Sequence, residues 1–154
     1  MSAIYLNDWE EGGFIQMVAD FEDICITAVE FGAESSPWPN KGEWLEKKEK
    51  LSDALRAENW TSIEVLIASY SHGGYEGDAF VLFRKDGKLY EVNAGHCSRY
   101  GIEGQWQPEE TSVEALRHRL DKGRLGRDNY CGNIFDTELR EVLSQIAATH
   151  KEGA

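Results

Sequence analysis

Two histidines and a neighbouring cysteine have the side chains best suited to form a reactive site. His72 follows the apolar run 62–71, and the adjacent pair His96 and Cys97 follows the run 88–94. If these runs are the first and third strands of an antiparallel meander, they point the same way and end at the same end of the sheet. A histidine beside a thiol can activate a cysteine nucleophile, and both residue types bind zinc. The three residues are therefore a candidate catalytic or metal site.

The spacing of these residues argues against both uses. Structural zinc sites pair their ligands at short spacing, such as C-x-x-C or H-x-x-x-H, and the chain contains neither pattern. His96 and Cys97 are adjacent, so in an extended chain their side chains point to opposite faces. The phosphate-binding patterns G-x-x-x-x-G-K-[ST] and G-x-G-x-x-G are also missing from the sequence. We predict no catalytic residue, metal or cofactor, and keep a small Cys/His enzyme or metal protein as the alternative.

The elements that would position these residues form one α+β domain over residues 1–154. Hydrophobic periodicity predicts four helices, over about 14–28, 43–57, 112–121 and 136–149, and a frayed tail over 150–154. The stretch 22–31 is also rich in β-branched residues, so it fits a strand as well as a helix. Residues 62–71 predict a central strand, and 78–95 predict a hairpin about Asp86-Gly87. The expected order is α-α-β-β-β-α-α, with the helices packed on a small antiparallel three-stranded meander.

Helix caps and a long loop complete this outline. The Thr111 to Glu114 spacing suits a capping box, with Thr111 or Ser112 as the cap. Asp136 or Thr137 is expected to cap the last helix. Residues 95–110 contain three glycines and predict an irregular loop.

Negative charge is concentrated at the start of the chain. The formal net charge is −12, and residues 1–40 hold eight acids but no Lys or Arg. Such a segment repels phosphate backbones, so we expect no direct binding of nucleic acid. A protein partner with a basic surface is expected instead. The acids expected to contact it are Asp20, Asp23, Glu30 and Glu34; the alternative is that the charge serves solubility alone.

Aromatic side chains in the expected loops are candidate anchors for a partner. Trp38 lies between two prolines, Tyr75 lies in a glycine-rich link, and Tyr100 and Trp106 lie in the 95–110 loop. Exposed aromatic rings often supply much of the energy of protein interfaces. The alternative is that these rings fold back and cover the sheet.

The basic stretch 117–127 is the main concentration of positive charge. It carries five Lys or Arg residues and one Asp. It could contact phosphate or an acidic partner. The alternatives are that its cations stabilise the C-terminus of a helix, or that they pair with the acidic first 40 residues.

Cysteine usage and hydropathy favour the cytoplasm. The chain has three cysteines, an odd number, and they are widely spaced, so a disulfide framework is not indicated. The first residues lack the basic and apolar regions of a signal peptide, and no run of about 18 apolar residues is present. We expect a protein of the cytoplasm that does not enter a membrane.

The middle of the chain, residues 69–120, resembles small acidic proteins encoded by tailed phages and bacterial prophages. The segment GHCS (95–98), the run Gly-Gln-Trp-Gln-Pro-Glu-Glu (104–110) and the helix after it carry the resemblance. It implies a phage accessory protein that acts inside a bacterium, and it implies no catalytic residue.

Together these observations favour a protein that binds and inhibits or modulates a host bacterial protein. A nucleic-acid-handling defence complex, such as a CRISPR or restriction system, is the expected class of target, because acidic surfaces can imitate phosphate charge. The alternatives are the Cys/His enzyme or metal protein and a structural phage protein. Self-association into a homo-oligomer is compatible with each reading.

Overall fold

A five-stranded mixed sheet forms the centre of the computed structural model, which describes residues 3–73, 76–96, 101–128 and 132–153. The strands lie side by side in the order of the sequence. They are β1 (Ile4–Asn7), β2 (Glu64–Gly73), β3 (Glu76–Lys85), β4 (Lys88–His96) and β5 (Glu109–Thr111). Strand β1 runs parallel to β2, and the other neighbours are antiparallel. A separate two-stranded ribbon pairs β6 (Arg127–Asp128) with β7 (Gly132–Asn133).

The hairpin predicted about Asp86-Gly87 is confirmed. Both turn residues have positive φ, 52° at Asp86 and 78° at Gly87. This is the two-residue turn whose twist matches that of paired strands, and Asp-Gly is a preferred sequence for it. The antiparallel β2-β3-β4 meander therefore exists as the middle of the sheet.

The prediction of an antiparallel three-stranded sheet is wrong, because β1 and β5 extend the meander at both edges. Strand β1 pairs in parallel with the stretch from Ile67 to Tyr70. A parallel pair needs a long crossover, here residues 8–63, so local sequence patterns do not reveal it. Strand β5 pairs with the start of β4, and its sequence Glu-Glu-Thr has no apolar alternation. Short polar strands of this kind are common at sheet edges.

The described residues form six helices where four were predicted. The first predicted helix, 14–28, divides into α1 (Gly13–Phe21) and the short α2 (Ala28–Gly32). The ambiguous stretch 22–31 is thus neither one helix nor a strand. Asp23 has positive φ (56°), a conformation that interrupts a helix, and the Thr27 side chain caps α2 with Glu30 in a reciprocal capping box.

The second predicted helix is confirmed as α3 (Lys41–Leu55), and a further short helix, α4 (Glu58–Thr61), follows it. Asn40 caps α3 by accepting a hydrogen bond from the backbone N–H of Glu43. The Lys48 side chain lies along apolar surface, with its Nζ 4.3 Å from the centre of a Trp44 ring.

The two C-terminal helices are confirmed as α5 (Val113–Lys122) and α6 (Asp136–Gly153). The cap of α5 is Ser112, which accepts a hydrogen bond from Ala115 N, and not a Thr111–Glu114 box. The cap lies one residue later than a Thr111–Glu114 box requires, because Ser112 has the extended backbone of an N-cap. Gly123 follows the last residue of α5 as its C-cap.

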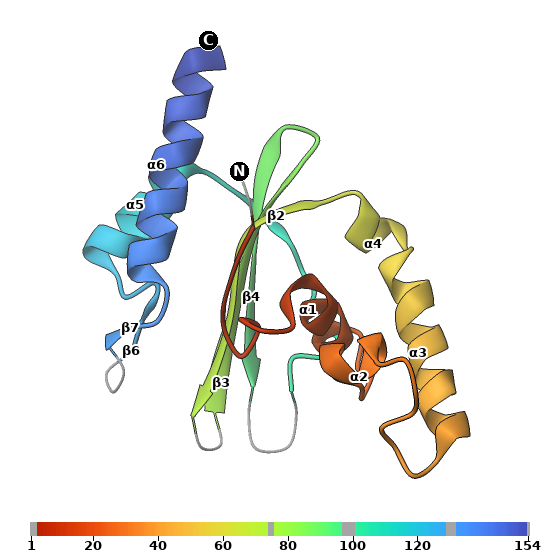
Figure 1. Cartoon of the computed structure of the whole chain (residues 1–154). Helices are drawn as coiled ribbons and strands as arrows, with labels where there is room; N and C mark the ends of the chain where they lie inside the picture. Colours follow the sequence, from red (N-terminus) through yellow and green to blue (C-terminus); the bar gives the residue numbers. More distant parts are fainter. Residues whose placement is uncertain (1–2, 74–75, 97–100, 129–131, 154) are drawn as a thin grey trace.

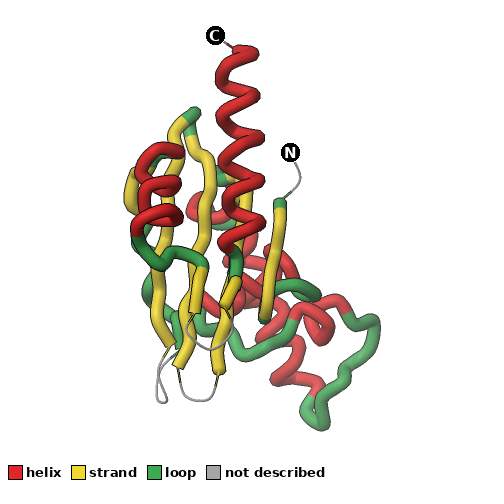
Figure 2. Tube along the Cα trace, turned by 90° about the vertical axis from the view of Figure 1, so that its left-hand side faces the viewer, coloured by secondary structure: helices red, strands yellow, loops and turns green. Residues whose placement is uncertain are grey.

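Helices cover both faces of the sheet. Helices α1 to α4 pack on one face with Val81 and Phe83, and α5 and α6 pack on the other with Phe80 and Leu82. Figure 1 shows these two helical layers on opposite sides of the strands, and Figure 2 looks onto the layer of α5 and α6. Because alternate residues of a strand face opposite sides, β3 needs apolar residues at nearly every position. Within the described ranges, no helix has the length and apolar character needed to cross a membrane.

Candidate acidic binding site

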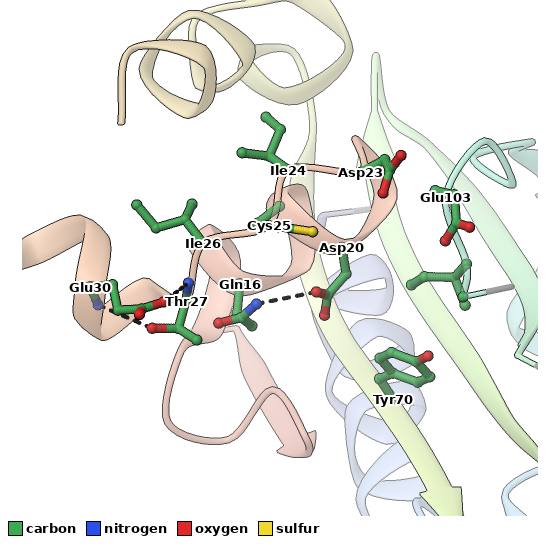
Figure 3. A pocket seen from close by; sticks show the side chains of 13 residues that line it. Gln16, Asp20, Asp23, Ile24, Cys25, Ile26, Thr27, Glu30, Tyr70 and Glu103 are labelled. Atoms are coloured by element: carbon green, nitrogen blue, oxygen red, sulfur yellow. Dashed lines mark hydrogen bonds between the residues drawn. The ribbon is translucent and has the colours of Figure 1, made fainter. Parts of the chain in front are cut away.

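The main candidate site is an open pocket of about 400 Å³ next to α1. Its walls come from α1, the loop 23–27, the start of α2, Tyr70 on β2 and residues 101–103 (Figure 3). The lining residues are Gln16, Ala19, Asp20, Asp23, Ile24, Cys25, Ile26, Thr27, Glu30, Tyr70, Gly101, Ile102 and Glu103. The pocket therefore joins the N-terminal quarter of the chain to a loop that follows β4.

Four carboxylates line this pocket, and none of its described lining residues is a Lys, Arg or His. Asp20, Asp23 and Glu30 are three of the four acids predicted to bind a partner. The fourth pocket carboxylate, Glu103, was missed, because it belongs to a loop whose position only the fold decides. Its negative charge within the 95–110 loop was the only available signal. Glu34, the remaining predicted acid, is exposed but does not line the pocket.

Asp20 is held in place by two hydrogen bonds. Its Oδ2 accepts one from Trp9 Nε1 at 2.7 Å, and its Oδ1 accepts one from Gln16 Nε2 at 3.1 Å. Gln16 is itself oriented, because its Oε1 accepts a hydrogen bond from the backbone N–H of Ala28 at 2.9 Å. Burial raises the pKa of Asp20 and nearby Asp8 raises it further, although the two hydrogen bonds act in the opposite direction. Asp20 is a fixed and partly desolvated carboxylate.

Glu30 is fixed on the opposite side of the pocket. It accepts a hydrogen bond from the backbone N–H of Thr27 at 2.9 Å, and a second from the indole of Trp38. These bonds lower the pKa of Glu30, with the Thr27 bond contributing most. The Trp44 indole donates a hydrogen bond to the backbone carbonyl oxygen of Glu30 at 2.9 Å. Glu30 is therefore held as a carboxylate at neutral pH.

Tyr70 forms the wall of the pocket on the sheet side and senses the surrounding charge. Its side chain is largely buried, and its ring is tilted against that of Trp9. Burial, together with smaller contributions from the charges of Asp20, Asp8 and Glu103, raises the pKa of Tyr70 to about 12. These three carboxylates thus act together on the hydroxyl of one pocket-lining tyrosine.

Tryptophan indoles hold three of the acids of the N-terminal segment. Besides the Trp9–Asp20 and Trp38–Glu30 pairs, Trp60 Nε1 donates to Glu22 Oε1 at 2.8 Å. In the sequence the tryptophans and the acids are separate features. No spacing rule connects them, because Trp60 and Glu22 are 38 residues apart.

The predicted aromatic anchors divide into three groups. Trp38 is half-buried and packs against the core. Trp106 lies within an aromatic cluster, with ring centroids 4.4 Å from Trp60, 5.0 Å from Phe21 and 5.4 Å from Phe83. Its ring therefore covers the sheet, as the alternative reading allowed. Tyr75 and Tyr100 lie outside the described residues.

The backbones of His72 and His96 lie at the same end of the sheet, as predicted. Both residues pair with Gly77, His72 from β2 and His96 from β4. Their side chains, and all of Cys97, lie outside what the structure describes. Among the described side chains, no group of three His, Cys, Asp or Glu residues could hold a metal ion. The Cys/His site therefore stays an untested alternative.

The basic stretch 117–127 belongs to the other helical layer, across the sheet from the acidic pocket. Its Arg119 pairs with buried Glu91 on β4, and Arg127 Nε lies 2.9 Å from Asp136 Oδ2. Residues 1–61 carry 13 acids and five bases, whereas residues 112–154 carry seven of each. The two helical layers therefore differ by eight formal charges, from −8 to zero.

Comparisons with protein-family models, with curated proteins and with solved structures find no significant match. The resemblance to phage proteins over residues 69–120 thus remains a prediction. Most of the pocket lies outside that range, since nine of its lining residues fall between positions 16 and 30. The chemistry of the pocket itself is therefore the evidence for its function.

Proposed function

We propose that this chain is a binding protein that attaches to a basic surface of another protein through its acidic pocket. One observation carries the proposal. Four carboxylates surround one open pocket, and the described lining residues supply no cation to neutralise them. Opposite charges across an interface accelerate association and select the correct partner.

The rigidity of two of the four carboxylates, Asp20 and Glu30, supports this function. The Trp9 and Gln16 side chains orient Asp20, while Thr27 and Trp38 orient Glu30. Groups that are already in place lose little conformational freedom when a partner binds. The acidic layer can therefore present fixed negative charges, as a nucleic-acid backbone does.

On this basis we propose that the partner is a host bacterial protein with a groove for nucleic acid, and that the chain is a phage or prophage product that inhibits or modulates it. A CRISPR or restriction complex is the class of target we favour. The unequal charges of the two helical layers support this proposal. The layer of residues 1–61 is negative and the layer of residues 112–154 is neutral, so a basic groove would attract the acidic layer.

Pull-down from bacterial lysate at low salt tests this function. The wild type is compared with the pocket variant Asp23→Asn/Glu103→Gln and with the control Glu110→Gln/Glu141→Gln. Both pairs remove two negative charges, but the control acids are exposed and lie outside the pocket. We expect a host protein that the wild type and the control retain, that the pocket variant loses, and that salt releases. Retention of no protein at low salt, or equal retention by all three, would contradict the proposal.

A small Cys/His enzyme or metal protein is the second candidate function. The pairing of both His72 and His96 with Gly77 is the observation that favours it. Metal analysis of the purified protein, together with the activity of a Cys97→Ser variant, tests this candidate. A metal-free protein whose Cys97→Ser variant keeps its biological effect would exclude it.

A further inference from the structure

We propose that the acidic pocket is a receptor for one arginine side chain of the partner, with the guanidinium next to Asp20, Asp23 and Glu103. This inference rests on the proposed function, because it names the group of the basic partner that enters the pocket. It goes beyond general charge attraction, since it assigns one cation to one cavity.

The size and the walls of the pocket suit an arginine. A space of about 400 Å³ is larger than a single metal ion or water requires. The lining combines the four carboxylates with buried apolar surface, from Ile102 and the ring of Tyr70. Arginine has the same combination, an aliphatic stem that packs on apolar surface and a charged head group.

The placement of the acids favours a polyatomic cation over a metal ion. Asp20, Asp23 and Glu103 all line the pocket, yet no three acids among the described side chains are close enough to hold a metal together. A guanidinium presents five N–H donors in a plane, so it can reach carboxylates that do not converge on one point. Figure 3 shows Asp20, Tyr70 and Glu103 around one side of this space, with Asp23 above them.

Asp20 has the capacity to accept further donors. A carboxylate has about four acceptor sites, and the bonds from Trp9 and Gln16 occupy one on each oxygen. The same two bonds fix the direction in which the carboxylate faces. Asp20 is partly buried, and the described lining residues give it no cationic partner. A charged donor that enters the pocket would supply that partner and form a strong, charge-assisted hydrogen bond.

Arginine is favoured over lysine for two physical reasons. The guanidinium is less strongly hydrated than an ammonium group, so it loses less on entering a pocket that is partly apolar. It also stacks on aromatic rings, and Tyr70 supplies a ring at the wall.

Titration of the ¹⁵N-labelled full chain with three blocked tripeptides tests the inference without any partner protein. The peptides are acetyl-Gly-Arg-Gly-amide, its lysine counterpart and its citrulline counterpart, which keeps the shape of arginine but not the charge. The indole resonance of Trp9 is the readout, because this N–H donates to Asp20. We expect a saturable shift with the arginine peptide, a weaker response to lysine and none to citrulline. No shift with arginine, or equal responses to all three peptides, would overturn the inference.

The double variant Asp23→Asn/Glu103→Gln supplies the second measurement. Both residues have partly or fully exposed side chains, and among the described residues neither side chain forms a hydrogen bond or ion pair that the fold requires, so folding should be kept. We expect the variant to bind the arginine peptide about tenfold more weakly, and the control Glu110→Gln/Glu141→Gln to bind it as the wild type does. If both variants lose the same affinity for the arginine peptide, the binding reflects general charge attraction, and the proposed arginine site is refuted.

The two proposals can fail separately. If the arginine peptide shifts the Trp9 resonance but the lysate yields no partner, the pocket inference stands and the proposed function fails. If a host protein is retained but no peptide reaches the pocket, the proposed function stands and the arginine inference fails.

Discussion

The indole Nε1 of Trp9 donates a hydrogen bond to Oδ2 of Asp20 at 2.7 Å, and so connects the completely buried tryptophan of the core to a carboxylate of the acidic pocket. Trp9 lies just after β1, and its ring contacts Phe21 on α1 and Tyr70 on β2. Packing of the core and orientation of the pocket charge are therefore coupled through one side chain.

The first prediction concerns this coupling. Trp9→Phe keeps an aromatic ring in the core but removes the N–H that Asp20 accepts. We expect the free energy of unfolding to fall by about 1.5–3 kcal/mol, the usual contribution of a hydrogen bond to a charged group. Urea denaturation measures it. The same change in an Asp20→Asn background should cost clearly less, because no carboxylate is left without its donor, and equal costs would contradict the coupling.

The second prediction concerns the pH dependence due to Asp20. Its pKa is raised in the folded state, so the native protein holds this proton at a pH where the unfolded chain has lost it. Stability therefore falls as pH rises from the unfolded pKa through the folded pKa. Asp20→Asn should remove this decline, so the stability of the variant relative to the wild type should increase with pH across the acidic range. Urea midpoints measured at several pH values check this, and a relative stability that decreases would contradict it.

The third prediction concerns Glu91, whose pKa shifts in the opposite direction. Burial raises this pKa, but hydrogen bonds from Arg119, Thr111 and Asn93 outweigh burial, and the pKa is lowered overall. The stabilisation from the ionised group is present above the unfolded pKa and is lost as pH falls through the folded pKa. Glu91→Gln should make unfolding less dependent on pH in the acid range. If urea denaturation shows the same loss of stability at acid pH in the variant as in the wild type, Glu91 does not contribute to that loss.

The fourth prediction uses two glycines with nearly equal backbone conformations. Gly126 and Gly87 have φ of 76° and 78°, but a Cβ on Gly126 would lie 2.8 Å from the backbone N of Asp136, while one on Gly87 meets nothing within 4 Å. Gly87→Ala should cost about 1 kcal/mol, from backbone strain alone. Gly126→Ala should cost clearly more, because α6 must also shift. Thermal unfolding of both variants compares them, and equal losses would show that this contact is relieved without cost.

The fifth prediction concerns the cap of α2. Thr27→Ala removes the side-chain acceptor of the Glu30 N–H and should destabilise the protein by about 1 kcal/mol. It should also loosen the capping box that holds Glu30, so the pKa of Glu30 should rise towards its ordinary value. An NMR titration of the Glu30 carboxyl measures this, and Thr27→Ser should preserve both properties.

Short-range patterns were enough to predict much of the scaffold. The Asp86-Gly87 turn, the apolar runs of β2 and β3, and the periodicity of α3, α5 and α6 are all local. They were predicted correctly because turn conformation and helical faces depend on residues only a few positions apart. The break between α1 and α2 was missed, because the positive φ of Asp23 competes with an apolar pattern that continues past it.

The pocket was predictable only as a concentration of acids. The sequence by itself determined that the first 40 residues carry eight acids and no Lys or Arg, and that any partner of this segment should be basic. Only the tertiary structure decided that Glu103 joins Asp20 and Asp23, and that an indole donates to each of Asp20, Glu22 and Glu30. Only the tertiary structure shows that β1 and β5 belong to the sheet, and that the basic stretch 117–127 lies on the opposite face of the sheet from the pocket. The reason is physical: composition and periodicity act over neighbouring residues, whereas strand pairing and side-chain hydrogen bonds join residues that the chain brings together only after folding.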